Sequence, residues 1–576
     1  MNHFLYKLFK KLNFIKNIFN NNFSKFLLND VNFNPLILSI VLNSFLYILL
    51  IIFTIPGYRS NDDILLNLIS SGFFGKETSE YLLFGSTILG NLFKLLYNIV
   101  PKYNWYLIFL ILTQFLSHVF ALYYFLKARN KYFTLFIYLC LFFIFSVNLY
   151  TEINFSGTSL VALSVSFLIL NTIIKKEKVI IFDYILLFFS SSVAFLIRKD
   201  VFYIFCFIFI LYTILYLESW KKLLIIFTVI TICFLLFNIY NTNYYRKIDP
   251  IQLQYQKARV SIIDWSIKPS NAELANHGWD KGDYDLFISF KGLDNIFYNK
   301  ASIVNLSKSI SYKFDYNKIL LSPYALILYV INDFYYYSFA LVFLFILFYL
   351  MRKSLRFFFS MQLFWILSFF ILAIIIVHYR QYVYYTLLFY LGLSGCFYIL
   401  QKTNSNKLQT SLRKSISYIF LILFSLSSIS LVIIIHNRII QNRKNTKEVV
   451  FNNYDNKIIE LQNSNKKFLV VGEESESLFS KWATFKSLKN NSDKRLTGKI
   501  IPAGWFINTV QYDRIVNGSV IKLLIEGNIY FLGKDEDLFN NLKKFVFKHY
   551  NLKVDFIELD SFKYSPVYKL ITSFPN

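Results

Sequence analysis

Two adjacent carboxylates, Asp62 and Asp63, follow the run 35–55, which is largely apolar and carries no charge. A carboxylate at a membrane edge can act as a general base or bind a hard cation such as Mg²⁺ or Mn²⁺. There it can meet a substrate whose reactive head is polar and whose tail lies in lipid. Two plainer interpretations stay open: the acids are solvated, or one of them caps the helix predicted for ILLNLISSG.

Four basic side chains form a second group on the side of the membrane that the topology below assigns to the exterior. Arg198 and Lys199 follow one apolar run, and His378 and Arg380 follow another. A guanidinium group is a planar fork that matches phosphate oxygens. We therefore predict that these residues bind the phosphate or pyrophosphate of a lipid-linked ligand. The alternative is that they only reach towards phospholipid headgroups, as basic residues at helix ends often do.

A third group lies in the segment 257–295, where tryptophan and tyrosine alternate with acids. Aromatic faces can stack on the C–H surfaces of sugars, and carboxylates can accept hydroxyl protons, so this group predicts a sugar- or acceptor-binding surface. The alternatives are an aromatic belt at the membrane interface and, for one acid, a cap on the helix 284–290. The acids do not have the spacing of an EF-hand calcium loop. The residues are Asp264, Trp265, Trp279, Asp283 and Tyr284.

The composition indicates the element that must position these groups. Of 576 residues, 56% are hydrophobic and 20% aromatic, which exceeds the apolar content of soluble chains and predicts an all-α polytopic membrane bundle. The net charge of +26 comes largely from short loops between apolar runs, as cytoplasmic loops require, and not from a surface for nucleic acid. The four cysteines lie inside apolar runs without CxxC spacing, so they predict neither disulfides nor a zinc site.

About eleven runs are long enough to cross a bilayer, and the segment 80–100 is ambiguous because it contains Lys94 and two glycines. If 80–100 does not cross, every strong basic cluster between spans faces the cytoplasm, so we predict an external interfacial or re-entrant segment. Residues 1–34 then form a basic amphipathic helix on the cytoplasmic face. The predicted spans are 35–55, 105–126, 132–150, 156–174, 179–197, 200–217, 221–240, 325–350, 357–377, 381–400 and 415–436.

This topology places three parts of the chain on the extracytoplasmic side: the loops 56–104 and 241–324, and the segment 437–576. The last segment contains predicted strands at 467–474, 528–533 and 552–559 and a predicted helix at 535–550, which favours a small α/β domain. It has no glycine-rich phosphate loop, so we expect it to act as a lid or to dock the acceptor. The predicted organisation is therefore 1–34, the membrane domain 35–436, and the extracytoplasmic domain 437–576.

In this layout the chain resembles the GT-C superfamily of integral-membrane glycosyltransferases. The resemblance rests on the acidic pair just past the first span, the interfacial segment after it, and the later external loop and C-terminal α/β segment. More narrowly, five stretches look like those of a group of bacterial membrane proteins. They are NDD (61–63), LLFGSTILGNLFKLLY (82–97), PKYNWY (101–106), RVSIIDW (259–265) and GWDKGDYDLF (278–287).

The resemblance implies a GT-C-like fold in the bacterial inner or plasma membrane and a sugar donor of polyprenyl-phosphate type. The acceptor would be a hydroxyl of a glycan or glycolipid on the extracytoplasmic face. Asp62 or Asp63 would act as base or metal ligand, and Arg198 and Arg380 would meet the donor phosphate. Several families carry Asp-Glu where this chain has Asp-Asp after Asn61, so a requirement for Mg²⁺ or Mn²⁺ stays open.

Three other functions remain as alternatives: a polysaccharide polymerase or ligase, a flippase for lipid-linked saccharides, and a non-enzymatic receptor. A polymerase or ligase would use the same external acids and arginines. A flippase would place ionisable residues near the middle of the bilayer, whereas the predicted spans are nearly free of charge. A receptor would not depend on the acids and arginines.

Overall fold

The computed structural model describes the larger part of the chain. The described residues are 31–310, except 32, 55, 75–76, 130, 176–178, 204–205, 207–219, 265–268 and 290–292; 342–344 and 347; 381–402; 454–471; 498–502; and 508–573, except 517.

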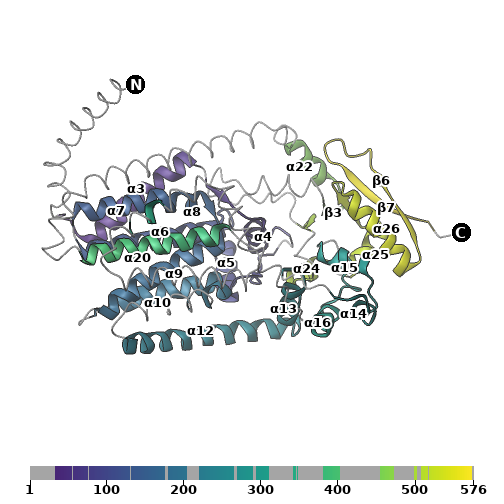
Figure 1. Cartoon of the computed structure of the whole chain (residues 1–576). Coiled ribbons are helices and arrows are strands. Elements are labelled where there is room, and N and C mark those ends of the chain that lie inside the picture. The colour runs from purple at the N-terminus through teal and green to yellow at the C-terminus, as the bar shows by residue number, and fades with distance from the viewer. Residues whose placement is uncertain are drawn as a thin grey trace, which may run out of the picture.

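Four of the described helical segments are long and apolar enough to cross a membrane, so the chain is an integral membrane protein. Two further apolar helices, α10 (Ile181–Ile197) and α20 (Gln381–Lys402), run alongside them (Figure 1). The four segments that could cross a membrane are α3 (Pro35–Thr54), α6 (Trp105–Ala128), the segment Tyr132–Thr151 and α9 (Phe155–Lys175). The segment Tyr132–Thr151 comprises α7 (Tyr132–Leu141), the π-helical turn η2 (Phe142–Ser146) and α8 (Val147–Thr151).

Helix α9 forms the centre of the bundle, where it is almost completely buried among α6, α10 and α20. Small residues such as Gly157, Ala162 and Ser166 allow neighbouring helices to approach it closely. Helix α3 lies at the periphery, and its exposed Phe45 and Ile52 face outwards. The bundle therefore presents apolar side chains where lipid would surround it.

Hydrogen bonds between side chains fix the helices against one another in the apolar core. Gln114 Nε2 donates to Thr158 Oγ1 at 2.9 Å, which joins α6 to α9. His118 of α6 contacts Ser146 Oγ at 2.6 Å and Tyr47 OH at 3.0 Å. In a membrane such polar contacts add specificity to packing that is otherwise apolar.

The four segments that could cross a membrane match the predicted spans 35–55, 105–126, 132–150 and 156–174 to within a few residues at each end, and the shorter helix α10 matches 179–197. The predicted spans 221–240 and 381–400 fall inside α12 (Trp220–Ile248) and α20. The runs 200–217, 325–350, 357–377 and 415–436 lie wholly or mostly outside the described residues, as does nearly all of the predicted N-terminal helix. The total of eleven spans therefore stays a prediction.

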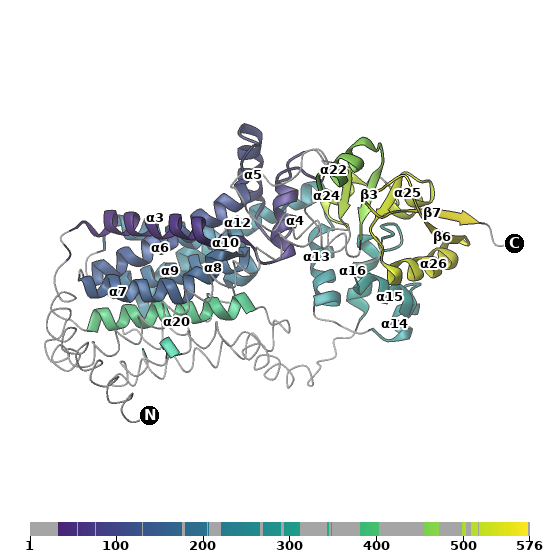
Figure 2. The same cartoon turned by 90° about the horizontal axis from the view of Figure 1, so that it is seen from above.

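Helix α5 (Thr87–Ile99) occupies the segment whose crossing was ambiguous. Its 13 residues cover roughly 20 Å, which is shorter than the ~30 Å hydrocarbon layer. Figure 2 shows α5 running across the direction of the bundle helices. One side buries Leu89 and Phe93, and the other exposes Leu95 and Ile99. A short amphipathic helix in this orientation supports an interfacial segment.

Short helices and one small pair of strands form a layer at one end of the bundle. Strand β1 (Gly57–Tyr58) pairs in parallel with β2 (Glu152–Ile153), which joins the first loop to the end of α8. Two capping boxes begin helices in the layer: Ser270 with Glu273, and Asp280 with Asp283. The helices are α4 (Asn61–Ser70), α13 (Gln252–Arg259), the π-helical turn η3 (Val260–Asp264), α14 (Asn271–Ala275), α15 (Lys281–Ile288) and α16 (Lys300–Ser309).

A five-stranded mixed sheet lies beyond this layer (Figure 1). The strand order is β4-β3-β5-β7-β6; β3 is parallel to β4 and β5, and β7 is antiparallel to β5 and β6. The three predicted strands and the predicted helix are present, and β4 and β7 are additional. The strands are β3 (Lys467–Val470), β4 (Ile500–Pro502), β5 (Ile529–Leu532), β6 (Lys553–Glu558) and β7 (Val567–Ser573), with helices α22 (Tyr454–Asn463), α24 (Val510–Ile515), α25 (Val520–Ile525) and α26 (Glu536–Tyr550).

The sheet and the loop layer share one hydrophobic core. Phe545 of α26 packs against Phe297 and Tyr298 at ring-centroid distances of 5.3 and 5.6 Å. Gly498 N also donates a hydrogen bond to Phe73 O at 2.9 Å. The predicted external parts therefore form one packed body, and the domain boundary at residue 437 falls outside the described residues.

Candidate functional site

Asp63 is completely buried in the first turn of α4, and four donors face its carboxylate. Tyr106 OH and Phe155 N each donate to Oδ1 at 2.9 Å. Ser60 Oγ donates to Oδ2 at 2.6 Å and Asn154 Nδ2 at 2.8 Å. These donors occupy both oxygens, so Asp63 ties the first loop to the adjacent ends of α6 and α9.

Burial raises the pKa of Asp63 from its ordinary value of 3.8 to about 7. Hydrogen bonds from Ser60, Tyr106 and Phe155 act in the opposite direction, because they stabilise the charged carboxylate, and the nearby charge of Asp62 raises the pKa further. Desolvation outweighs the hydrogen bonds. Near neutral pH both the charged and the neutral form of this carboxyl group are therefore populated.

Asp62 has different surroundings, because one residue along a helix turns the side chain by about 100°. It is half-exposed, whereas Asp63 has no exposed surface. The N-cap of α4 is Ser60, so neither aspartate is the cap that the sequence suggested as one interpretation. Of the two acids, Asp62 is the one that a dissolved or lipid-linked molecule can reach.

The surroundings of Asp63 do not fit a divalent cation. Mg²⁺ or Mn²⁺ needs open oxygen lone pairs, but N–H and O–H donors already face both carboxylate oxygens. Within the described ranges, no group of three or more His, Cys, Asp or Glu side chains could hold a metal ion. No step of the proposal below therefore depends on one.

The pairing of β1 with β2 places Arg59 beside Glu152, and the two side chains form a partly exposed ion pair next to the Asp63 cluster. Sequence analysis missed Arg59, Glu152 and Asn154 as members of this site. A signal was present: TEINFSG (151–157) directly follows the apolar run 132–150, just as YRSNDD (58–63) comes soon after the first run. Polar residues that end successive outward spans lie on the same side of a bundle.

Arg198 follows α10 and contacts the same turn that holds Asp63. Its Nη1 donates to Ser156 Oγ. The guanidinium carbon lies 4.7 Å from the ring centroid of Phe155 and 5.5 Å from that of Phe84. Phe155 therefore has two roles: its backbone nitrogen donates to Asp63, and its ring supports Arg198. Asp63 and Arg198 therefore both contact the short segment 154–156.

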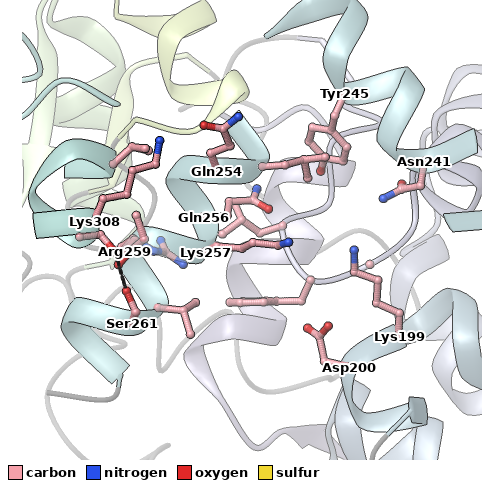
Figure 3. Close-up of a pocket in the computed structure, with 18 residues that line it drawn as sticks. Lys199, Asp200, Asn241, Tyr245, Gln254, Gln256, Lys257, Arg259, Ser261 and Lys308 are labelled. Atoms are coloured by element: carbon pink, nitrogen blue, oxygen red, sulfur yellow. Dashed lines mark hydrogen bonds between the residues drawn. The ribbon is translucent and has the colours of Figure 1, made fainter. Parts of the chain in front are cut away.

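A cavity of 810 Å³ lies beside this cluster and contains Lys199 in its wall. Figure 3 shows Lys199 and Asp200 facing Lys257 across it. Asp62, Asp63 and Arg198 do not line the cavity, but Phe84, which packs against Arg198, does. The cavity wall comes from the loop 83–85, the residues after Arg198, helix α12, the segment α13–η3 and helix α16, and its charged residues are Lys199, Asp200, Lys257, Arg259 and Lys308.

Trp279 and Tyr284, predicted to bind sugar, are instead packed into the outer layer. Trp279 is 3% exposed and Tyr284 is 7% exposed. The indole stacks on Phe297, with ring centroids 5.8 Å apart, and meets Tyr298 edge-on at 5.0 Å. An indole packed in this way offers no open face for a sugar in this structure. These two residues stabilise the layer that carries the cavity.

Asp283 joins the loop layer to the C-terminal sheet. It is 2% exposed and accepts from Lys548 Nζ at 2.6 Å and His549 Nε2 at 3.0 Å. The N-cap of α15 is Asp280, and Asp283 completes the capping box from the third helical position, so the predicted cap was one turn too late. The side chain of Asp264 lies outside the described residues, as do Trp265, His378 and Arg380.

No protein-family model matches the chain, and no curated protein matches it. Two solved structures of ArnT from Cupriavidus metallidurans resemble it. The apo structure has 11% sequence identity and a TM-score of 0.37, over 92% of this chain and 97% of that chain. The structure bound to undecaprenyl phosphate has 10% identity and a TM-score of 0.35, over 93% and 97%.

Proposed function

We propose that the chain is a membrane glycosyltransferase of the GT-C kind. It transfers a sugar from a polyprenyl-phosphate-linked donor to an acceptor hydroxyl on the extracytoplasmic face. One observation carries the proposal: Asp63 and Arg198, which follow different spans, both contact residues 154–156 beside a cavity with a basic wall. An acid and a cation at one rim of the bundle are what a transfer from a lipid phosphate requires.

Asp62 is the general base in this proposal. The acceptor oxygen forms a bond to the anomeric carbon, and its proton passes to the carboxylate of Asp62. The bond between the anomeric carbon and the phosphate oxygen breaks, and the phosphate leaves with the electron pair. Because this is a single displacement, the anomeric configuration is inverted. Asp63 is a positioning residue, since its carboxylate holds the first turn of α4 against α6 and α9.

Basic residues stabilise the leaving phosphate. A fixed cation is most effective where charge develops in the transition state, and Arg198 and Lys199 lie where the bundle meets the outer layer. Arg380 and His378, outside the described residues, complete the predicted phosphate site. Helix α5 separates the site from lipid, because its apolar outer face carries Leu92 and Leu95.

Substitutions of Asp62 and Arg198 test the proposal in cells that lack the native gene. Asp62→Asn removes the base and lowers transfer by about 100-fold or more, and Arg198→Gln raises the donor KM as well. Asp285→Asn is the matched control, because Asp285 is an exposed acid of the same layer outside the cluster. Mass spectrometry of the surface glycan, with expression levels matched, is the readout. A flippase or receptor would tolerate Asp62→Asn, so an intact glycan in that variant contradicts the proposal.

A further inference from the structure

The charges around the cavity are unevenly distributed. Three lysines and Arg259 line it, against the single carboxylate of Asp200. Arg259 is 6% exposed, so its charge is held largely away from water. Within the described residues Lys257 and Lys308 form no ion pair. Grouping like charges around one hollow is unfavourable until a bound anion offsets their repulsion.

The uncharged polar groups of the wall suit a ligand rich in hydroxyls. Asn241, Gln254, Gln256, Ser261 and Ser307 supply both donors and acceptors. Asn241 is held in place, because its Oδ1 accepts from the backbone nitrogen and the hydroxyl of Thr87 at 2.8 and 2.9 Å. Figure 3 shows its amide nitrogen turned into the cavity. A fixed donor of this kind can select a ligand hydroxyl at a defined position.

The volume of the cavity and the apolar part of its wall limit the class of ligand that it can bind. The volume of 810 Å³ lies within the range of ~300–1,000 Å³ typical of small-molecule sites and exceeds what one sugar ring occupies. Leu83, Phe84 and Val304 give part of the wall an apolar character, which matches the C–H faces of a sugar ring. The set of cations, amides and apolar surface fits a saccharide better than an inorganic anion alone.

The cations lie at two ends of the cavity. Lys199 comes from the bundle side, whereas Arg259 and Lys308 come from α13 and α16 in the outer layer, and Figure 3 shows the two sets on opposite sides of the cavity. In the proposed function, the lipid phosphate lies at the end beside Lys199. A phosphate anchored in lipid does not explain why there are cations at the outer end. A second anionic group, carried by the saccharide, accounts for Lys257 and Lys308, which form no ion pair within the described residues.

We infer that the cavity binds a saccharide carrying a carboxylate or phosphate group, and that this saccharide is the acceptor of the transfer. The assignment as acceptor rests on the proposed function. Binding itself does not, because it depends only on Lys257, Arg259, Lys308 and the amides of the wall. Neither Trp279 nor Tyr284 takes part.

Binding is measured with the full chain in lipid nanodiscs and two matched probes, cellobiose and its carboxylate analogue, glucuronosyl-glucose. The acidic disaccharide binds about tenfold or more tightly than the neutral one. Lys257→Gln and Lys308→Gln each weaken it by about threefold to tenfold, since each removes one partly solvated charge. Both lysines are exposed, so the variants fold. Lys281→Gln, an exposed lysine outside the cavity, leaves the affinity unchanged.

Three results overturn the inference. Equal affinity for the two disaccharides, or full affinity in both lysine variants, means that the cavity does not recognise an anionic saccharide. Displacement of the acidic disaccharide by a polyprenyl phosphate assigns the cavity to the donor headgroup and removes the acceptor assignment. Asp62→Asn keeps binding even though transfer is lost, so failure of the inference and failure of the proposed function are distinguishable.

Discussion

Asp62 and Asp63 are neighbours in the chain, yet the start of α4 gives their carboxylates different surroundings. The sequence shows two equivalent acids after an apolar run. It does not show that Ser60 begins the helix or that Tyr106, Asn154 and Phe155 close around the second acid. The contacts of Tyr106, Asn154 and Phe155 come from two segments that are distant in sequence, the start of α6 and the turn before α9. The presence of the acidic pair was predictable, but the division of roles within it depends on tertiary structure.

Because the pKa of Asp63 is raised in the folded chain, its contribution to the free energy of unfolding falls as the pH rises. Its pKa is about 7 in the folded chain, against an ordinary value of 3.8, so the folded state binds a proton more tightly between these pH values. The contribution of Asp63 to stability is therefore largest at low pH and falls as the pH rises from about 4 to about 7. It is constant above that range.

Thermal unfolding in detergent micelles from about pH 4 to about pH 8 measures this slope, which is at most about 1.4 kcal/mol per pH unit. Asp63→Asn removes the slope, because the amide does not titrate. It also lowers stability by about 1–3 kcal/mol, since an amide nitrogen then faces other donors. Asp62→Asn retains the slope and is the matched control. The same slope in Asp63→Asn and in the unmodified chain would rule out this origin.

At the scale of elements, apolar runs and alternating strands were strong predictors. The spans 105–126 and 156–174 and the strands at 467–474 and 528–533 all appear close to their predicted positions. The two-residue pair β1–β2 has no sequence signature, because its pairing depends on where two spans end. Strand β7 was missed although its residues alternate. The π-helical turn η2 lies within a uniform apolar run, so no local pattern marks it.

Helix α5 depends on Gly90 for its close packing. A Cβ at this position would lie 2.0 Å from the backbone oxygen of Glu80, so Gly90→Ala must move one of the two backbones. We expect α5 to separate from the loop before it and trypsin to cleave after Lys94 about tenfold faster or more, because local opening exposes the site. Asn91→Ala, in the next position of the same helix, is the control. An unchanged cleavage rate in Gly90→Ala would show that α5 does not rely on this contact.

At the scale of the whole molecule, side-chain contacts distinguish the two ends of the bundle. Tyr106 and Arg198 meet the Asp63 cluster at one end of α6 and α10. Lys127 and Asp183 form an ion pair of 3.0 Å at the opposite end of the same two helices. The loop layer and the C-terminal sheet lie at the first end (Figure 1). All proposed chemistry is therefore on one side of the membrane.

The positive-inside rule predicts that the other side faces the cytoplasm, because Lys127, Arg129 and Lys131 lie there. Single cysteines test this in a chain whose four native cysteines are replaced by alanine. A membrane-impermeant maleimide labels Lys281→Cys in intact cells, since that residue is exposed in the outer layer, and labels Lys131→Cys only after permeabilisation. Labelling of Lys131→Cys in intact cells would place the loop layer in the cytoplasm, where a donor presented at the outer face is out of reach of Asp62 and the cavity.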